Sequence, residues 1–243
     1  MIRSVPLIVV LAVCISCKPA QPQASKSTAS GPRVRATVVS IRTTLEPEKR
    51  AVVHTLVIAG DRVRNTGEHD IWRLYDTKAN TITIVDDVER TIRTEPLSAV
   101  VRRRAAANDG PIPTHFPRPR LVRMNDQKVL HGTTARRTVI ESGAWRRELW
   151  MAEHPLIPRG LFAMMQASEK PSSPLAPMMG AVDEALTAER GFPLADRTTV
   201  PVGKGNMIVD RTVVSIAERE VPESLMVLPK DYKDVTPRPA PAP

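Results

Sequence analysis

The sequence predicts an α+β protein that is mainly β and is built on one large antiparallel sheet with a few helices. The first observation is a series of short segments between residues 51 and 95 that are rich in β-branched residues or alternate apolar with polar residues. The second is that every break between these segments contains Gly, Asn or Asp, which tolerate the dihedrals of turns. The third is a change to helical spacing of apolar residues between residues 154 and 191.

The chain begins like an exported protein. Arg3 gives a positively charged start, and residues 5–16 form an apolar run too short to span a bilayer as a helix, so residues 1–16 are expected to be a signal peptide. Both cysteines, Cys14 and Cys17, lie in this run or directly after it. The rest of the chain therefore has no thiol for a disulfide, for metal ligation or for catalysis.

Residues 13–17, with the sequence Val-Cys-Ile-Ser-Cys, resemble a bacterial lipobox. The resemblance implies that Cys17 is acylated, becomes the first residue of the mature protein and anchors it in a membrane. Cys14 occupies a position where Leu is usual, and an ordinary cleaved signal peptide is the alternative. Asp after the cysteine often marks lipoproteins retained in the inner membrane, so Lys18 favours the outer membrane, with the protein facing the periplasm.

The composition limits the partners of the protein. The formal net charge is +9, and aromatic residues make up 3% of the 243 residues. A basic surface is attracted to anionic lipid headgroups. Nucleic-acid binding is disfavoured, because an exported chain with so few aromatic residues has little with which to stack on bases. We expect one globular domain, residues 33–235, in a monomer.

The first half of the chain is expected to be a tether followed by strands. Residues 17–32 are rich in Ser, Ala, Gln, Pro and Lys without apolar periodicity, which is typical of a disordered tether after the lipidated cysteine. In the strand at residues 51–59, His54 falls on an apolar face, where it either lines a site or is a core residue. The strands predicted in this half are residues 33–44, 51–59, 61–65, 70–75, 81–85 and 91–94.

Three helices and a second block of strands are expected in the remainder. Pro96 suits the first position of a helix that ends near Asn108, and short helices are predicted at Leu161–Met165 and from Pro177 to a capping Gly191. Residues 111–119 contain four prolines and form a loop. The predicted strands are residues 120–124, 128–131, 134–141, 145–151, 195–202 and 207–217, with a turn at 125–127, a last ordered segment at 225–234 and a disordered Pro-rich tail at 236–243.

Five segments of the sequence carry a resemblance to a known family. They are Ala59-Gly60-Asp61-Arg62-Val63-Arg64, Leu74-Tyr75-Asp76 with residues 81–86, Val129-Leu130-His131-Gly132 with residues 136–139, Arg147-Glu148-Leu149-Trp150-Met151-Ala152, and Leu228-Pro229-Lys230-Asp231-Tyr232-Lys233. Taken together, these segments resemble bacterial envelope proteins of an uncharacterised LolA-like domain family. The resemblance implies a strongly curved antiparallel sheet, a half-open barrel, with helices on its concave side. A cysteine common in such proteins is Ala135 here, so a role tied to that thiol is absent.

The leading functional prediction is a membrane-anchored, non-enzymatic binding protein with a hydrophobic groove. Relatives of this fold accommodate acyl chains in the concavity, and the resemblance therefore implies a lipid or an acylated protein as ligand. The candidate groove residues are Met164, Met165, Met178, Met179, Val182 and Leu186, whose alternative role is core packing. The alternative function is a protein-interaction or sensor module of the cell envelope with no lipid ligand.

An enzyme is not expected, and neither catalytic residues, a metal nor a cofactor is predicted. The sequence contains no His-Glu-x-x-His and no Gly-x-Ser-x-Gly motif, and its five histidines are spread over separate predicted elements. Asp86 and Asp87 are adjacent at a strand end, where successive side chains point to opposite faces. This makes them turn residues rather than a general acid and base.

Overall fold

The computed structural model describes residues 31–66, 70–108, 117–168, 176–187 and 189–237. All of them belong to one compact unit, Gly31–Pro243. The expected signal peptide, Cys17 and nearly all of the tether lie outside the described residues, as do residues 238–243 of the expected tail.

The described residues form a mainly β structure with three short α-helices and one twelve-stranded sheet. The strands are β1 (Arg33–Glu46), β2 (Arg50–Ala59), β3 (Arg62–Thr66), β4 (Ile71–Asp76), β5 (Thr81–Asp86), β6 (Thr91–Pro96), β7 (Arg120–Leu130), β8 (Thr133–Ser142), β9 (Trp145–Ala152), β10 (Phe192–Val202), β11 (Gly205–Pro222) and β12 (Lys233–Asp234). The helices are α1 (Leu97–Asn108), α2 (Leu161–Ser168) and α3 (Ala176–Thr187), with a 3-10 turn at Glu223–Met226.

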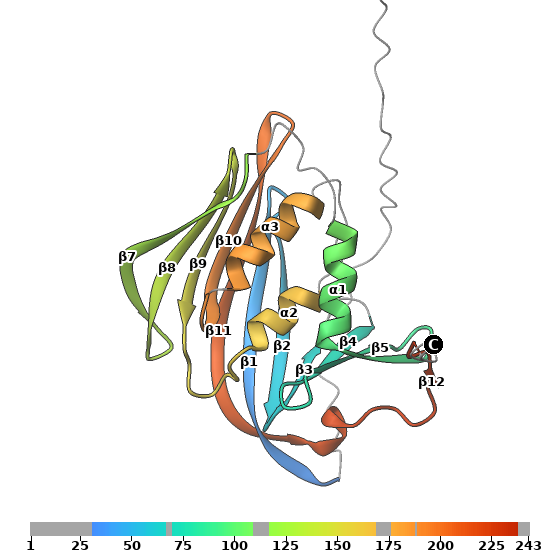
Figure 1. The fold of residues 1–243 in the computed structure, drawn as a ribbon. Helices are drawn as coiled ribbons and strands as arrows, with labels where there is room; N and C mark the ends of the chain where they lie inside the picture. Colours follow the sequence, from blue (N-terminus) through green and yellow to red (C-terminus); the bar gives the residue numbers. More distant parts are fainter. Residues whose placement is uncertain (1–30, 67–69, 109–116, 169–175, 188, 238–243) are drawn as a thin grey trace, which may run out of the picture. The chain divides into compact units, whose positions relative to one another are not determined.

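The strand order is β12-β6-β5-β4-β3-β2-β1-β11-β10-β9-β8-β7 (Figure 1). Every neighbouring pair is antiparallel except β12 and β6. The prediction of a large antiparallel sheet is confirmed, but the sheet is neither closed nor strongly curled. Closure requires the two edge strands to pair, and here one edge is the two-residue β12 and the other is the irregular β7.

The meander β2–β6 follows the predicted strands closely because its turns are fixed by local chemistry. Asn80 and Arg90 adopt positive φ angles of 53° and 51° in two of these turns. The carboxylates of Asp76 and Asp86 each accept two backbone N–H groups of the turn that follows them. The interpretation of Asp86 as a turn residue is therefore confirmed.

Two local predictions are wrong. The turn expected at residues 125–127 is a bulge inside the single strand β7: the register slips between Arg123 and Gln127, and Asp126 accepts a hydrogen bond from Arg137 of β8. Gly191 does not cap α3, which ends at Thr187. Its φ of 96° instead brings its backbone against the Ala152 carbonyl at the end of β9.

All three helices lie on one face of the sheet (Figure 1). On β2 the side chains alternate as predicted: Leu56 and Ile58 join the core beneath the helices, whereas Val57 points to the opposite face. That opposite face carries a smaller core around Trp72, which is covered by Met226 and its neighbours in the C-terminal segment. The sheet therefore has an apolar layer on each side, and the larger one is beneath the helices.

The C-terminal segment, residues 223–236, runs from the 3-10 turn to the β6 edge. Thr236, the first residue of the expected tail, is itself bonded, because its side-chain oxygen accepts a hydrogen bond from the backbone N–H of Thr94. Lys233 and Val235 donate backbone hydrogen bonds to Arg90 and Ile92. The segment thereby covers the outer strand of the meander.

Candidate ligand-binding cavity

A row of polar side chains crosses the helix-covered face of the sheet. Each of seven neighbouring strands contributes one of them. Several members are direct partners in the strand pairing: Asn65 is opposite Arg73, and Arg211 is opposite both Thr43 and Asp196. On most of these strands the residue two positions away belongs to the apolar core, so the row replaces one line of that core. From β4 to β9 its members are Arg73, Asn65, His54, Thr43, Arg211, Asp196 and Arg147.

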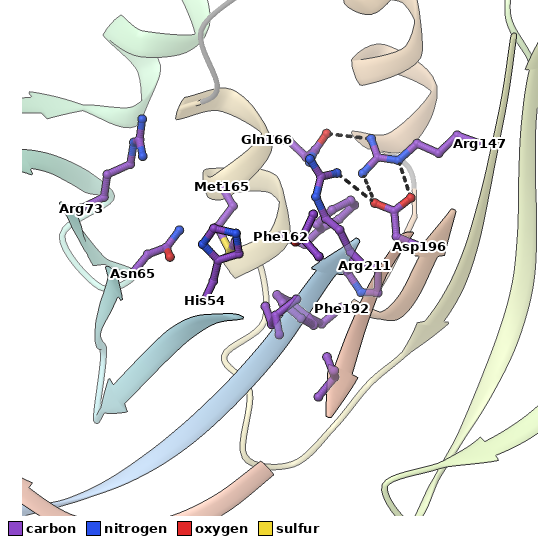
Figure 2. Close-up of a pocket in the computed structure, with 14 residues that line it drawn as sticks. His54, Asn65, Arg73, Arg147, Phe162, Met165, Gln166, Phe192, Asp196 and Arg211 are labelled. Atoms are coloured by element: carbon purple, nitrogen blue, oxygen red, sulfur yellow. Dashed lines mark hydrogen bonds and ion pairs between the residues drawn. The ribbon is translucent and has the colours of Figure 1, made fainter. Parts of the chain in front are cut away.

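This polar row forms the floor of a cavity of about 360 Å³, and α2 forms its roof. From the helix, Phe162, Met165 and Gln166 face the floor, and Phe192 of β10 closes one wall (Figure 2). Pro193 also lines the cavity. Phe162 and Phe192 meet edge to face, with their ring centroids 6.4 Å apart. The cavity therefore has an apolar wall beside a polar floor.

One half of the floor is a buried ion pair. Arg147 donates from Nε to Oδ1 of Asp196 at 3.1 Å and from Nη2 to Oδ2 at 2.7 Å, and both side chains are almost completely buried. The third nitrogen of Arg147 donates to Oε1 of Gln166 on α2 at 3.2 Å. The pair thus fixes the helix to the sheet, in the bidentate geometry that suits a guanidinium and a carboxylate.

Asp196 is an ionised carboxylate rather than a proton donor. Burial alone raises the pKa of a carboxyl group, but Arg147 and Arg211 outweigh this effect and hold the pKa of Asp196 below its ordinary value. Arg211 contributes from Nη1, 3.4 Å from Oδ2 of Asp196. At neutral pH this carboxylate balances charge and does not exchange protons.

The other half of the floor carries positive charge without a carboxylate. Arg73 and Asn65 lie on one side of His54, and Arg211, Arg147 and Asp196 lie on the other (Figure 2). Among the residues that line the cavity, three guanidinium groups face one carboxylate, which leaves a formal excess of two positive charges. The cavity therefore favours an anionic group over a cation.

The structure brings one of the predicted groove residues to this cavity and places three others in the core. Met165 lines the cavity. Met164, Val182 and Leu186 are buried in the main core beneath the helices, at 3%, 0% and 4% exposure. Met178 and Met179 lie on α3, and their side chains are outside the described part of the structure.

His54 lines the cavity, so its predicted role in a site stays a prediction, and the charged members of the row were not predicted. A signal for two of them exists in the sequence. A tight turn at Gly203 fixes the register of the β10–β11 hairpin, and this register places Asp196 opposite Arg211. Arg147 stands at an inward position between Trp145 and Leu149, where an arginine needs a buried partner.

Comparisons with known proteins leave the family open. No protein-family model matches the chain, and no curated protein matches it. Two solved structures of PNGF-II are similar, with TM-scores of 0.45 and 0.39 and sequence identities of 8% and 7%. The matches cover 84% of this chain but 31% and 32% of PNGF-II, so the chain spans about a third of that protein. A likeness this remote defines neither a family nor a function.

The described residues contain neither a membrane-spanning helix nor a cluster of metal-ligating side chains. None of the described helices combines the length and the apolar character needed to cross a membrane. No group of three or more His, Cys, Asp or Glu side chains in the described ranges is arranged to hold a metal ion. The cavity between α2 and the sheet is therefore the site on which a functional proposal is built.

Proposed function

We propose that this chain is a membrane-anchored, non-enzymatic lipoprotein of the bacterial envelope that binds the acyl chain of a lipid or of an acylated protein. In this proposal Cys17 carries the anchor in the outer membrane, and the chain is a relative of the LolA-like family whose helix-covered sheet is less curved than a half-open barrel. The observation that carries the proposal is the cavity between α2 and the sheet, with the apolar wall of Phe162, Met165 and Phe192.

The size of the cavity supports a single chain. At about 360 Å³ it is near the lower end of the roughly 300–1,000 Å³ typical of ligand pockets. One acyl chain, or part of one, suits this volume better than the several chains of a complete lipoprotein anchor. Burial of each methylene contributes about 0.8 kcal/mol, so an apolar wall is sufficient for binding and no catalytic group is required.

The lining chemistry also favours binding over catalysis. Asp196, the carboxylate among the lining residues, is engaged by Arg147 and Arg211 and stays ionised. An ionised carboxylate in a tight ion pair is a poor general acid and a poor general base. Accordingly, we assign Asp196 the role of positioning the arginines.

The test is to identify the lipid that stays bound to the protein when it is purified from membranes. Full-length protein is purified from a bacterial host, non-covalent lipid is extracted with organic solvent, and the extract is measured by mass spectrometry. We expect stoichiometric acyl lipid with the wild type and its loss in Met165→Trp, which fills the cavity. Met124→Trp, an exposed position on β7, is the matched control and retains the lipid.

The outcomes separate binding from misfolding. Circular dichroism and the thermal midpoint show whether Met165→Trp is folded. Wild-type protein without lipid, or a folded Met165→Trp protein with as much lipid as the wild type, would contradict the proposal.

The alternative, a protein-interaction or sensor module, has one observation in its favour. Strand β7 is an edge of the sheet, and it exposes two apolar side chains, Met124 at 39% and Val129 at 71%. An open edge of this kind is a template for strand addition by a partner protein. A lipid-free wild-type protein that cross-links to an envelope protein through β7 would favour this function.

A further inference from the structure

The cavity contains a cation for which the described residues supply no acceptor. Across the described ranges, no hydrogen bond or ion pair is found for the side chain of Arg73, and its Nε atom is buried without a partner. Arg147, in contrast, is bonded to Asp196 and Gln166. A buried donor without an acceptor lowers the stability of the folded protein. An arginine at such a position is therefore best explained by a ligand that supplies the acceptor.

The surroundings of Arg73 are suited to an anion. Asn65 stands directly opposite Arg73 on β3 and adds an amide group to the same part of the floor. The lining carboxylate, Asp196, is on the far side of His54 and belongs to the ion pair with Arg147 (Figure 2). Near Arg73, the lining residues therefore present donors and no competing negative charge.

The apolar wall begins beside this polar corner. Met165 of α2 lines the cavity between Arg73 and Phe162, and Phe192 lies beyond it on the side away from Arg73 (Figure 2). A ligand with a charged head and an apolar chain matches this order of side chains. A neutral chain would leave the buried Nε of Arg73 without an acceptor.

We propose that Arg73, assisted by Asn65, binds the anionic head group of the ligand, a carboxylate or a phosphate, while its acyl chain lies against Phe162, Met165 and Phe192. This inference rests on the proposed function and adds the chemical class of the ligand. The planar guanidinium donates two parallel hydrogen bonds to the two oxygens of either anion. The ion pair of Arg147 and Asp196 stays intact and fixes the position of α2 above the chain.

The test compares three photo-crosslinkable probes with the same chain and different heads: palmitic acid, hexadecyl phosphate and the neutral hexadecanol, each with a diazirine in the chain. They are added to bacterial membranes that contain the full-length protein, and labelled peptides are identified by mass spectrometry. In the wild type we expect labelling of α2 or β10, with at least one anionic probe preferred over the alcohol. Whichever anion is preferred identifies the head group as a carboxylate or a phosphate.

The deciding variant is Arg73→Gln, with Arg42→Gln as the matched control on the exposed face of β1. Arg73→Gln is expected to reduce labelling by the preferred anionic probe about tenfold, the effect of one lost charge-assisted hydrogen bond. Labelling by hexadecanol stays unchanged, and this also shows that the variant is folded. Arg42→Gln leaves all three probes unchanged.

The outcomes distinguish the two proposals. If all three probes label the wild type equally, or if Arg73→Gln leaves the anionic preference intact, the head-group inference is overturned and acyl binding stands. If no probe labels α2 or β10 in the wild type, the proposed function fails and the head-group inference fails with it.

Discussion

The hydroxyl of Tyr232 donates a hydrogen bond to Oδ1 of Asp87 at 3.0 Å, and the indole Nε1 of Trp72 donates to the same oxygen at 3.2 Å. Asp87 thereby joins the C-terminal segment to the meander. Beside this junction Arg90 forms an ion pair with Asp231, and its guanidinium lies over the ring of Tyr232. These contacts hold the segment over the face of the sheet opposite the helices.

Tyr232→Phe is expected to lower the urea midpoint of unfolding, with a difference from the wild type that depends on pH. Partial burial and Asp87 raise the pKa of Tyr232. Its hydrogen bond therefore contributes fully below the unfolded pKa of about 10 and is lost as the pH rises through the folded pKa. The difference between the two midpoints shrinks above about pH 10. A difference that stays constant through that range contradicts the role given to the hydroxyl.

Asp196→Asn is expected to lower the free energy of unfolding by about 3–5 kcal/mol, because it removes the buried carboxylate to which two nitrogens of the Arg147 guanidinium are bonded. Urea unfolding measures the change. Asp210→Asn, which breaks the more exposed pair with Arg197, is the control and costs at most about 1 kcal/mol. The double replacement Arg147→Met and Asp196→Leu restores most of the loss, since it removes both charges together. Equal effects of the two single variants would contradict the account of the buried pair.

The Asp196 carboxylate also predicts how the stability of the protein depends on pH in acid. Because the pKa of Asp196 is held below its unfolded value, its stabilising contribution is present above about pH 4 and is lost as the pH falls through the folded pKa. The wild type and Asp196→Asn should therefore converge in urea midpoint as the pH falls below about 4. If the two midpoints converge on raising the pH instead, the sign of the shift is wrong.

Arg73→Met is expected to raise the free energy of unfolding by about 1 kcal/mol, because it removes a buried Nε donor that has no acceptor. The variant also loses the anionic ligand, so stability and binding change in opposite directions, as is common at functional sites. Arg42→Met, on the exposed face of β1, changes neither. A destabilised Arg73→Met protein, measured by urea unfolding without ligand, would show that Arg73 has a structural role.

Gly191→Ala is expected to destabilise the protein by about 3 kcal/mol, since a Cβ atom at this position would lie 2.5 Å from the Ala152 carbonyl oxygen, and φ is 96°. Gly132→Ala is the matched control. The φ of Gly132 is also positive, at 74°, but a Cβ there meets no atom within 4 Å. Gly132→Ala is therefore destabilised only by backbone strain, about 1 kcal/mol. Comparable thermal midpoints for the two variants would rule out the steric contact as the cause.

Short-range patterns in the sequence predicted much of the sheet. Ile82 and Ile84 were expected to share one face, and both pack in the core beneath the helices. The turn residues placed the breaks of the meander correctly, because Asp, Asn and Gly determine turn geometry within four residues. The bulge in β7 was not predicted, because Asn125 and Asp126 are common both in turns and in bulges. Only the pairing of β7 with β8 shows that these residues form a bulge inside one strand.

The cavity depends on long-range pairing, which local patterns do not contain. Arg73 and Arg211 reach the same cavity only because β1 pairs with β2 on one side and with β11 on the other. The alternation along β4 places Arg73 on a face but does not say what lies across from it. The methionines of α2 and α3 were selected as groove residues by helical spacing, and spacing alone does not distinguish Met165, which lines the cavity, from Met164, which is buried in the core.

The pairing of β1 with β11 has a consequence for the order of folding. The two strands pair from Arg33 opposite Pro222 to Glu46 opposite Ile208, with one register shift between Ser40 and Ile41, so the centre of the sheet joins the first and nearly the last of the described strands. During synthesis from the N-terminus, β1 has no β11 to pair with until almost the whole domain has been made. Contacts between such distant segments form slowly, because a long loop must close before they stabilise the chain. The centre of the sheet is thus expected to be completed late in folding.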